Sequence, residues 1–107
     1  MAEPVLKPYR KQILVCTGPR CAPDTSPELY QYLKKRLIEK GLYHEDDKRV
    51  ARVQCNCFGV CTGGPILAVQ PDGIWYHGVT KEKLEEILAR HIEQGEPVEK
   101  YIFHRAS

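Results

Sequence analysis

Residues 11–21 have the sequence KQILVCTGPRC, which joins a short apolar run to the first two cysteines of the chain. The apolar run Ile-Leu-Val at 13–15 follows charged residues, as is typical of a short buried β-strand. The sequence therefore predicts a first strand over residues 11–16. A second cysteine, Cys21, follows after four further residues, Thr-Gly-Pro-Arg. Cys16 and Cys21 thus form a pair at the end of the predicted strand.

A helix is predicted next. Ser26 followed by Pro27 is a typical helix start, because the serine side chain accepts a hydrogen bond from an unpaired backbone N–H and proline has none to satisfy. Three leucines then recur every four residues: Leu29, Leu33 and Leu37. Gly41 can supply the left-handed residue that ends a helix. We therefore expect a helix over residues 27–40, with Ser26 as its cap and the basic residues 34–36 on a solvated face.

Strands are predicted in the middle of the chain. Residues 50–54 have the sequence VARVQ, which favours a second strand that leads to the remaining three cysteines. Residues 66–70 and 74–77 flank Pro-Asp-Gly, in which proline fixes one backbone dihedral and glycine accepts a positive one. The sequence therefore predicts a β-hairpin here.

The last predicted helix begins at Thr80, which can cap it, and Val79 can pack on Leu84 as a hydrophobic staple. The apolar residues at helical spacing are Leu84, Ile87, Leu88 and Ile92. Gly95 marks the end of the helix, and residues 98–103 are expected to add a short extended tail. The order strand, helix, strand, hairpin, helix requires a crossover, so it predicts an α/β fold with a mixed sheet, two main helices and a β-hairpin.

Composition fits one globular domain. The chain has 107 residues, of which 42% are hydrophobic and 28% charged. We expect residues 1–10 to be a flexible lead-in and 11–107 to form the domain. No apolar stretch approaches the roughly 18 residues of a membrane-spanning helix, and the N-terminus lacks the apolar centre of a secretory signal. The expected location is the cytoplasm, and the formal charge of +2 is too small to favour nucleic acid as a partner.

The five cysteines are many for a cytoplasmic chain, in which clustered thiols more often hold a metal or carry redox chemistry than form disulfides. Cys16 and Cys21 enclose four residues, and Cys57 and Cys61 enclose three, so each pair can converge on one metal centre. Glycines near both pairs let backbone N–H groups approach sulfur. If the two strands before the pairs are parallel neighbours, the pairs emerge at one edge of the sheet and close a four-thiolate site.

These gaps, the following TGGPILAV and PDGIWY and the late GEPV together resemble the thioredoxin-like 2Fe-2S ferredoxins, from about residue 11 to residue 103. That family is related to the small iron-sulfur subunit of respiratory NADH dehydrogenase. The resemblance implies a thioredoxin-like fold and one 2Fe-2S cluster per chain, with Cys16, Cys21, Cys57 and Cys61 as its ligands. It also implies one-electron transfer between redox proteins, rather than enzymatic catalysis, and known members include homodimers.

The chain departs from the family pattern in two respects. Its first cysteine gap is shorter than in several of these ferredoxins and closer to that of the respiratory subunit. The fifth thiol, Cys55, lies two residues before Cys57 and has the same reach. Cys57 alone gives the three-residue gap to Cys61, so we expect Cys57 to be the ligand and Cys55 to be a small buried residue at the strand end.

Other metal and redox sites fit less well. A structural four-cysteine zinc site needs the same thiolates and remains an alternative, as does a thioredoxin-like thiol oxidoreductase, although its Cys-x-x-Cys motif is absent. A plant-type ferredoxin would have a third cysteine where Asp24 lies. A Rieske site needs two histidine ligands, but the four histidines are scattered and are expected at the surface or in apolar contacts: His44, His77, His91 and His104. Arg20 is expected to favour the reduced cluster through its positive charge.

Overall fold

The computed structural model describes residues 9–17, 25–43, 49–55 and 64–106. Several features that were predicted from the sequence lie outside these ranges, and they are most of the lead-in, Arg20, Cys21, Asp24, His44, Cys57 and Cys61. None of the helices formed by the described residues has the length and apolar character of a membrane span.

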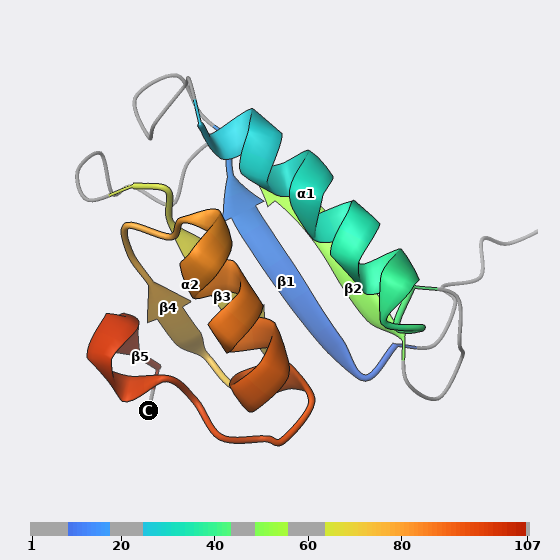
Figure 1. Cartoon of the computed structure of the whole chain (residues 1–107). Helices are drawn as coiled ribbons and strands as arrows, with labels where there is room; N and C mark the ends of the chain where they lie inside the picture. Colours follow the sequence, from blue (N-terminus) through green and yellow to red (C-terminus); the bar gives the residue numbers. More distant parts are fainter. Residues whose placement is uncertain (1–8, 18–24, 44–48, 56–63, 107) are drawn as a thin grey trace, which may run out of the picture.

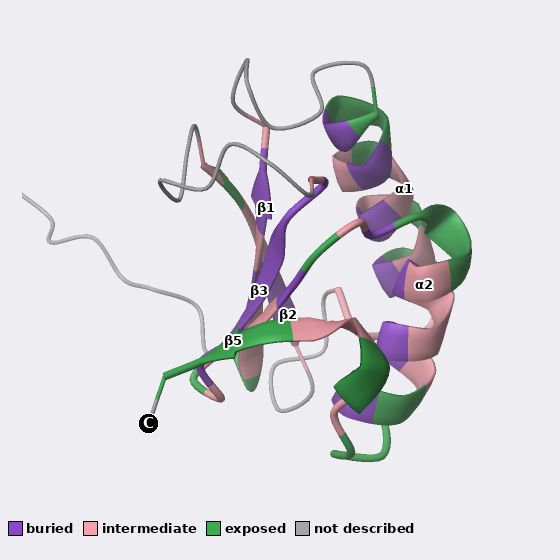
Figure 2. Cartoon of the chain, turned by 90° about the vertical axis from the view of Figure 1, so that its left-hand side faces the viewer, coloured by how far each residue is buried: buried purple, intermediate pink, exposed green. Residues whose placement is uncertain are grey.

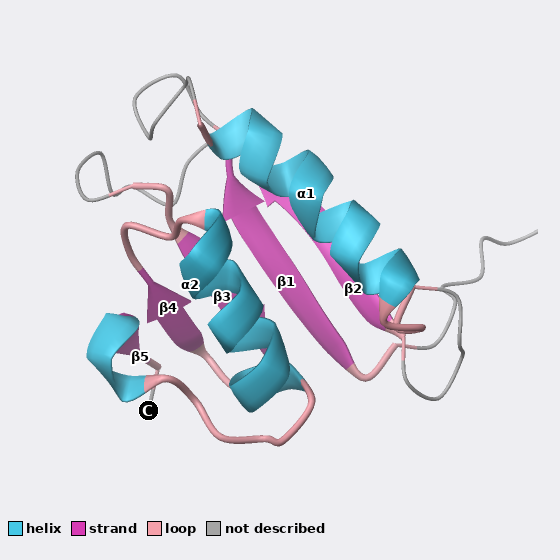
Figure 3. Ribbon diagram, viewed as in Figure 1, coloured by secondary structure: helices cyan, strands magenta, loops and turns pink. Residues whose placement is uncertain are grey.

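The described elements form one five-stranded sheet with helices on one of its faces (Figures 1 and 3). In chain order they are β1 (Lys11–Cys16), α1 (Ser26–Glu39), β2 (Val50–Cys55), β3 (Leu67–Gln70), β4 (Ile74–Tyr76), α2 (Lys81–Glu86), the π-helical η1 (Ile87–Ile92), the 3-10 turn η2 (Glu99–Tyr101) and β5 (Ile102–Arg105). The strand order is β2-β1-β3-β4-β5. Because β1 pairs with β2 in parallel and the other pairs are antiparallel, the predicted mixed sheet is confirmed.

Helix α1 forms where the leucine spacing places it, but it begins differently from the prediction. Thr25 is the N-cap, and its side chain makes no capping hydrogen bond. Ser26 is therefore not the cap; it is the first helical residue and is fully buried. Gly41 adopts a φ of +73° and supplies the expected left-handed residue after the helix.

Helix α2 begins as predicted, because the Thr80 side chain accepts a hydrogen bond from the Lys83 backbone N–H at 3.2 Å. Val79 and Leu84 are both buried in the main core. From Ile87 onward the helix widens into the π-helical η1, which the sequence analysis did not predict. Gly95, with a φ of +78°, follows the end of this segment.

The hairpin and the tail complete the sheet. Strands β3 and β4 pair antiparallel around Gly73, whose φ of +69° suits glycine alone, so the predicted hairpin is confirmed. The expected extended tail forms β5, which pairs with β4 after the short turn η2. The main core lies between the sheet and the two helices, and the helix sides that face the sheet are buried (Figure 2).

A polar contact of Arg36 between the two helices corrects the expectation that residues 34–36 form only a solvated face. Arg36 Nε lies 2.6 Å from Glu85 Oε2. The Tyr32 hydroxyl donates to the same carboxylate oxygen at 2.5 Å. The side chain of Arg36 is 27% exposed, so this basic residue connects α1 with the end of α2.

Candidate metal centre

The parallel pair β1 and β2 brings the two cysteine segments to one edge of the sheet. Its register pairs Lys11 with Val50 at one end and Cys16 with Cys55 at the other. Both strands therefore run toward the same edge and end side by side there, as the direction of β1 and β2 in Figure 1 shows. The segments 18–24 and 56–63, which carry the other cysteines, follow directly from these two strand ends.

Cys16 is fully buried, in a small apolar group that is separate from the main core. Side chains alternate along a strand, so Cys16 points to the sheet face opposite to that of Val15, which lies in the core beneath the helices. Cys16 and Ile66 form the buried part of the group, and Cys55 and Trp75 pack against it. Trp75 thus packs against the buried Cys16 and Ile66.

Backbone hydrogen bonds hold the end of β1 from both sides. The Cys16 N–H donates to the Ile66 carbonyl at 3.0 Å, and the Thr17 N–H donates to the Cys55 carbonyl at 2.8 Å. The Thr17 hydroxyl also donates to the Cys55 carbonyl at 3.4 Å. The backbone on which Cys16 sits is therefore fixed by the strands on either side of it.

Cys55 lies directly opposite Cys16, on the same face of the sheet. It is at the strand end, as expected, but it is only partly buried, which corrects the prediction of a buried residue. β2 is an edge strand, so only one neighbouring strand covers it. The local sequence could not predict this, because the exposure depends on which strand becomes the edge.

The described part of the site fits a thiolate-bound cluster. The Cys16 thiol lies at a buried position on a backbone held from both sides, and Cys55 ends β2 beside it. Cys21, Cys57 and Cys61 lie outside the described residues, so their sulfur positions stay a prediction. Among the described residues, no three His, Cys, Asp or Glu side chains gather closely enough to hold a metal elsewhere.

The described histidines have different environments. His77 and His104 are exposed, as expected of surface residues. His91 is fully buried, and both of its ring nitrogens are engaged: Nε2 lies 2.6 Å from Asp72 Oδ2, and Nδ1 lies 2.7 Å from the Tyr76 hydroxyl oxygen. Sequence reasoning missed this polar network, although the PDGIWY segment, which contains Asp72 and Tyr76, was part of the family resemblance.

Burial and the neighbouring groups change the acid–base properties of this network. Burial lowers the pKa of His91, although Asp72 opposes that effect. Burial works to raise the pKa of the Asp72 carboxyl, but contacts from Lys11 and His91 bring it below its ordinary value. Burial also raises the pKa of Tyr76. Near neutral pH, Asp72 is therefore ionised, and His91 and Tyr76 are neutral.

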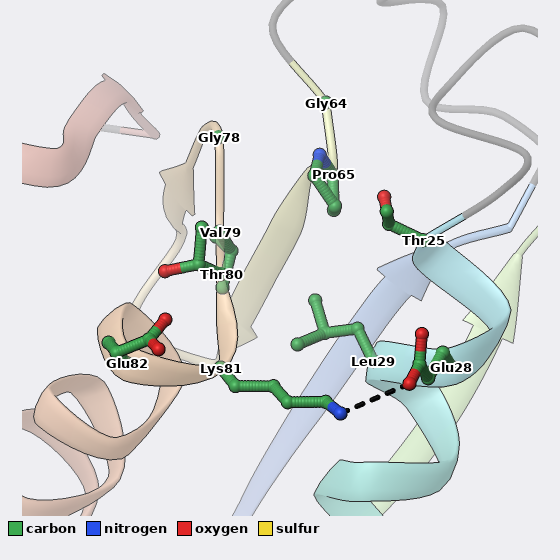
Figure 4. A pocket seen from close by; sticks show the side chains of 10 residues that line it. All are labelled: Thr25, Glu28, Leu29, Gly64, Pro65, Gly78, Val79, Thr80, Lys81 and Glu82. Carbon is green, nitrogen blue, oxygen red and sulfur yellow. Dashed lines mark hydrogen bonds and ion pairs between the residues drawn. The ribbon is translucent and has the colours of Figure 1, made fainter.

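A pocket of about 410 Å³ lies between the N-termini of the two helices (Figure 4). Thr25 and Gly64, which adjoin the two cysteine segments, are among its lining residues. Across it, Lys81 Nζ lies 3.1 Å from Glu28 Oε1, the pair that the dashed line marks in Figure 4. Neither Cys16 nor Cys55 lines the pocket, so it adjoins the cysteine segments without including a described thiol.

Comparison with known proteins identifies the family. The family model described as thioredoxin-like [2Fe-2S] ferredoxin matches residues 5–91, which is most of the chain. The chain belongs to this family. The fold, the cluster type and the electron-carrying function expected from the resemblance are therefore those of a 2Fe-2S ferredoxin.

Individual relatives agree with this assignment. A 2Fe-2S ferredoxin from Clostridium pasteurianum is 35% identical to this ferredoxin over 99 residues, covering 85% of this chain and 93% of the relative. A 2Fe-2S ferredoxin from Aquifex aeolicus is 30% identical over 104 residues, covering 89% and 90%. The solved structure of a thioredoxin-like [2Fe-2S] ferredoxin from Aquifex aeolicus matches with a TM-score of 0.81 at 27% identity, over 92% of this chain and 94% of that one.

Proposed function

We propose that Cys16, Cys21, Cys57 and Cys61 are the four ligands of this ferredoxin's 2Fe-2S cluster. The observation that carries the proposal is the parallel register of β1 and β2, which pairs Cys16 with Cys55. Cys57 and Cys61 follow Cys55 in sequence, and Cys21 follows Cys16. The chain therefore leaves β1 and β2 toward the two cysteine segments from neighbouring points at one edge of the sheet. Thiolates are the usual protein ligands of such clusters.

The described residues hold one proposed ligand, Cys16, in a fixed and buried position. Cys16 is held by backbone bonds on both sides, so its sulfur needs little reorganisation when the oxidation state changes. Its burial against Ile66 excludes water from this ligand, and solvent access is one of the factors that set a reduction potential. When bound, the cluster supplies reversible one-electron chemistry. The protein's part is to position, shield and electrostatically tune it.

Cys57 is preferred to Cys55 as the third ligand. Only Cys57 gives the three-residue gap to Cys61 that the family resemblance implies. Cys55 is still part of β2: its carbonyl accepts the Thr17 N–H, and its side chain packs against the group that contains Cys16. These contacts favour a structural role for Cys55 beside the cluster.

The proposed partners are redox proteins that donate and accept single electrons. Four thiolates, two ferric ions and two sulfides give an oxidised centre a charge of about −2. The formal charge of +2 on the chain then falls to about 0 in the oxidised protein and about −1 in the reduced one. The basic sequence pI therefore misrepresents the loaded protein, because the cluster neutralises the excess of basic residues.

Further parts of the proposal concern the state of the protein in the cell. We propose a cytoplasmic carrier that transforms no substrate of its own, with residues 11–107 as the domain and 1–10 as its lead-in. Homodimers occur in the family, and a homodimer is the proposed assembly. Sedimentation equilibrium of the loaded protein would separate a dimer from the 12.3 kDa chain.

The proposed function is tested on protein purified without exposure to oxygen. We expect a red-brown protein with about two irons and two acid-labile sulfides per chain. A colourless protein that contains one zinc per chain would contradict the proposal in favour of a structural zinc domain. A metal-free protein with a reactive dithiol would contradict it in favour of a thiol oxidoreductase.

A further inference from the structure

Two sequence segments of this ferredoxin contain none of the proposed cluster ligands, yet the structure brings them together at one buried side chain. PDGIWY contributes Asp72 and Tyr76, GEPV contributes Val98, and the side chain between them is His91. The bonds run in a chain: Asp72 contacts His91, His91 contacts Tyr76, and the Tyr76 hydroxyl oxygen accepts the Val98 N–H at 3.2 Å. Tyr76 and His91 are both fully buried.

The hydrogen-bond partners fix where the protons lie. Lys11 Nζ donates to both oxygens of Asp72, at 2.9 and 3.0 Å, so Asp72 is an ionised acceptor and His91 Nε2 must carry a hydrogen. The Val98 N–H can only donate, so the Tyr76 hydroxyl accepts from it and is left with its own hydrogen to give. His91 Nδ1 accepts that hydrogen, and His91 is therefore neutral.

A second proton on His91 would be incompatible with these donor and acceptor roles. A hydrogen on Nδ1 would point at the Tyr76 hydroxyl oxygen, so the tyrosine would have to turn its own hydrogen away within a buried site. A buried donor that loses its acceptor destabilises the folded arrangement. The other groups that act on His91 are Asp72 in the hairpin turn, which favours the proton, and Lys11 in β1 and Arg105 in β5, which oppose it.

The C-terminal segment 98–106 is attached to this network at both ends. At its start, the N–H of the buried Val98 donates to Tyr76. At its end, the Ala106 N–H donates to the carbonyl of Gly73, the residue after Asp72, at 2.7 Å. Between these points β5 pairs with β4, and most of its residues are exposed. Val98 lies in the main core, Tyr101 and Ile102 pack against that core, and the Tyr101 hydroxyl donates to Glu86 at 2.9 Å, so the network acts together with these contacts to hold the segment.

We propose that His91 is an acid-sensitive latch: its neutral form holds segment 98–106 on the edge of β4, and uptake of one proton releases that segment. The folded protein keeps His91 neutral, whereas the released form allows water to reach a charged imidazole. Release is therefore coupled to proton uptake below the ordinary histidine pKa of about 6.5. The latch is separate from the cysteine site and does not depend on the cluster ligands.

The test follows hydrogen–deuterium exchange of residues 98–106 in the oxidised, cluster-loaded protein between about pH 5 and pH 8, corrected for the intrinsic pH dependence of exchange. We expect the opening equilibrium of this segment to rise by up to about tenfold per pH unit between pH 6.5 and the lowered pKa of folded His91, because opening binds one proton in that interval. Visible absorption of the same samples should stay constant. Protection of the segment that does not change with pH would overturn the proposal.

His91→Gln removes the titration but keeps a polar side chain, so its segment should exchange without pH dependence. His77→Gln and His104→Gln are the matched controls, because both histidines are exposed, His77 contacts Phe103 of the segment and His104 belongs to it, and both variants should leave the pH dependence intact. The ring ¹⁵N shifts of His91 in the unaltered protein give a measurement that needs no variant. They should report the neutral tautomer with hydrogen on Nε2 at pH 8, whereas a charged imidazole at that pH would contradict the latch.

Discussion

Cys16 and Cys55 lie directly opposite each other in the parallel pair of β1 and β2, on the same face of the sheet. Only Cys16 is among the proposed ligands. The two residues therefore form a useful pair for mutation, since they share residue type and a place at a strand end but differ in burial and in the proposed role.

Cys16→Ala should abolish stable cluster binding, because it leaves the centre with three of its four proposed thiolates. Cys55→Ala should leave iron and sulfide at about two of each per chain. Metal and sulfide analysis with visible absorption measures both, and far-ultraviolet circular dichroism checks that each variant folds. Loss of the cluster in Cys55→Ala, with retention in Cys57→Ala, would instead assign Cys55 as the third ligand.

Arg20→Glu should lower the reduction potential, because Arg20 neighbours Cys21 in sequence and a negative charge there disfavours the more negative reduced state. Lys35→Glu makes the same charge change on exposed α1 and should leave the potential almost unchanged. Protein-film voltammetry measures both variants. Equal potentials in Arg20→Glu and the parent protein would show that Arg20 does not affect the reduction potential of the cluster.

Thr80→Ala should destabilise the protein by about 1 kcal/mol, because it removes the acceptor of the Lys83 N–H at the start of α2. That loss corresponds to a fall of roughly 4–8 °C in the unfolding midpoint of a domain of this size. Thr25→Ala is the control, since the Thr25 side chain makes no capping bond. Thermal scans of both cluster-loaded variants at one fixed rate measure their unfolding midpoints. Equal midpoints for Thr80→Ala and Thr25→Ala would show that the Thr80 capping bond does not stabilise the protein.

Gly73→Ala should destabilise the protein more than Gly41→Ala. Both glycines have positive φ, which costs other residues about 1–2 kcal/mol. A Cβ on Gly41 would meet nothing within 4 Å, whereas a Cβ on Gly73 would lie 2.9 Å from the Ala106 Cβ. Adding Ala106→Gly to Gly73→Ala should recover part of the loss in thermal scans. If the double variant has the same unfolding midpoint as Gly73→Ala alone, the contact with Ala106 does not cause the destabilisation.

Arg36→Ala should lower the unfolding midpoint more than Lys35→Ala, because Arg36 contacts Glu85 across the two helices and Lys35 is exposed. The pair is partly exposed, so the difference should shrink at about 1 M salt, where charges are strongly screened. Thermal scans at low and high salt measure this. A difference that is unaffected by salt would point to lost apolar contact of the arginine stem instead.

The parts of the fold that the sequence predicted correctly have local causes. The Ile-Leu-Val run forms β1, the four-residue leucine spacing forms the buried side of α1, and Pro-Asp-Gly forms the hairpin turn. Thr80 caps α2 through a residue only three positions away. In each case the deciding contacts lie within a few residues, so the sequence pattern contains them.

The error at the start of α1 is a shift of one residue, whereas the contacts that were missed join residues far apart in sequence. Ser26 was expected to cap α1, but Thr25 takes that position and Ser26 is buried inside the helix. Arg36 finds its partner 49 positions away in Glu85. His91 is recognisable as a buried polar residue only once the hairpin turn, β4 and the C-terminal segment come together around it. A local sequence pattern does not predict such long-range contacts.

The register of β1 and β2 supports the binding of one 2Fe-2S cluster by four cysteine ligands where these strands end. The decisive experiment is electron paramagnetic resonance before and after reduction with dithionite, together with iron and sulfide counts. We expect a silent oxidised protein and, after reduction, a spin-one-half signal that integrates to about one spin per two irons. A sample that contains zinc and gives no signal on reduction would contradict it.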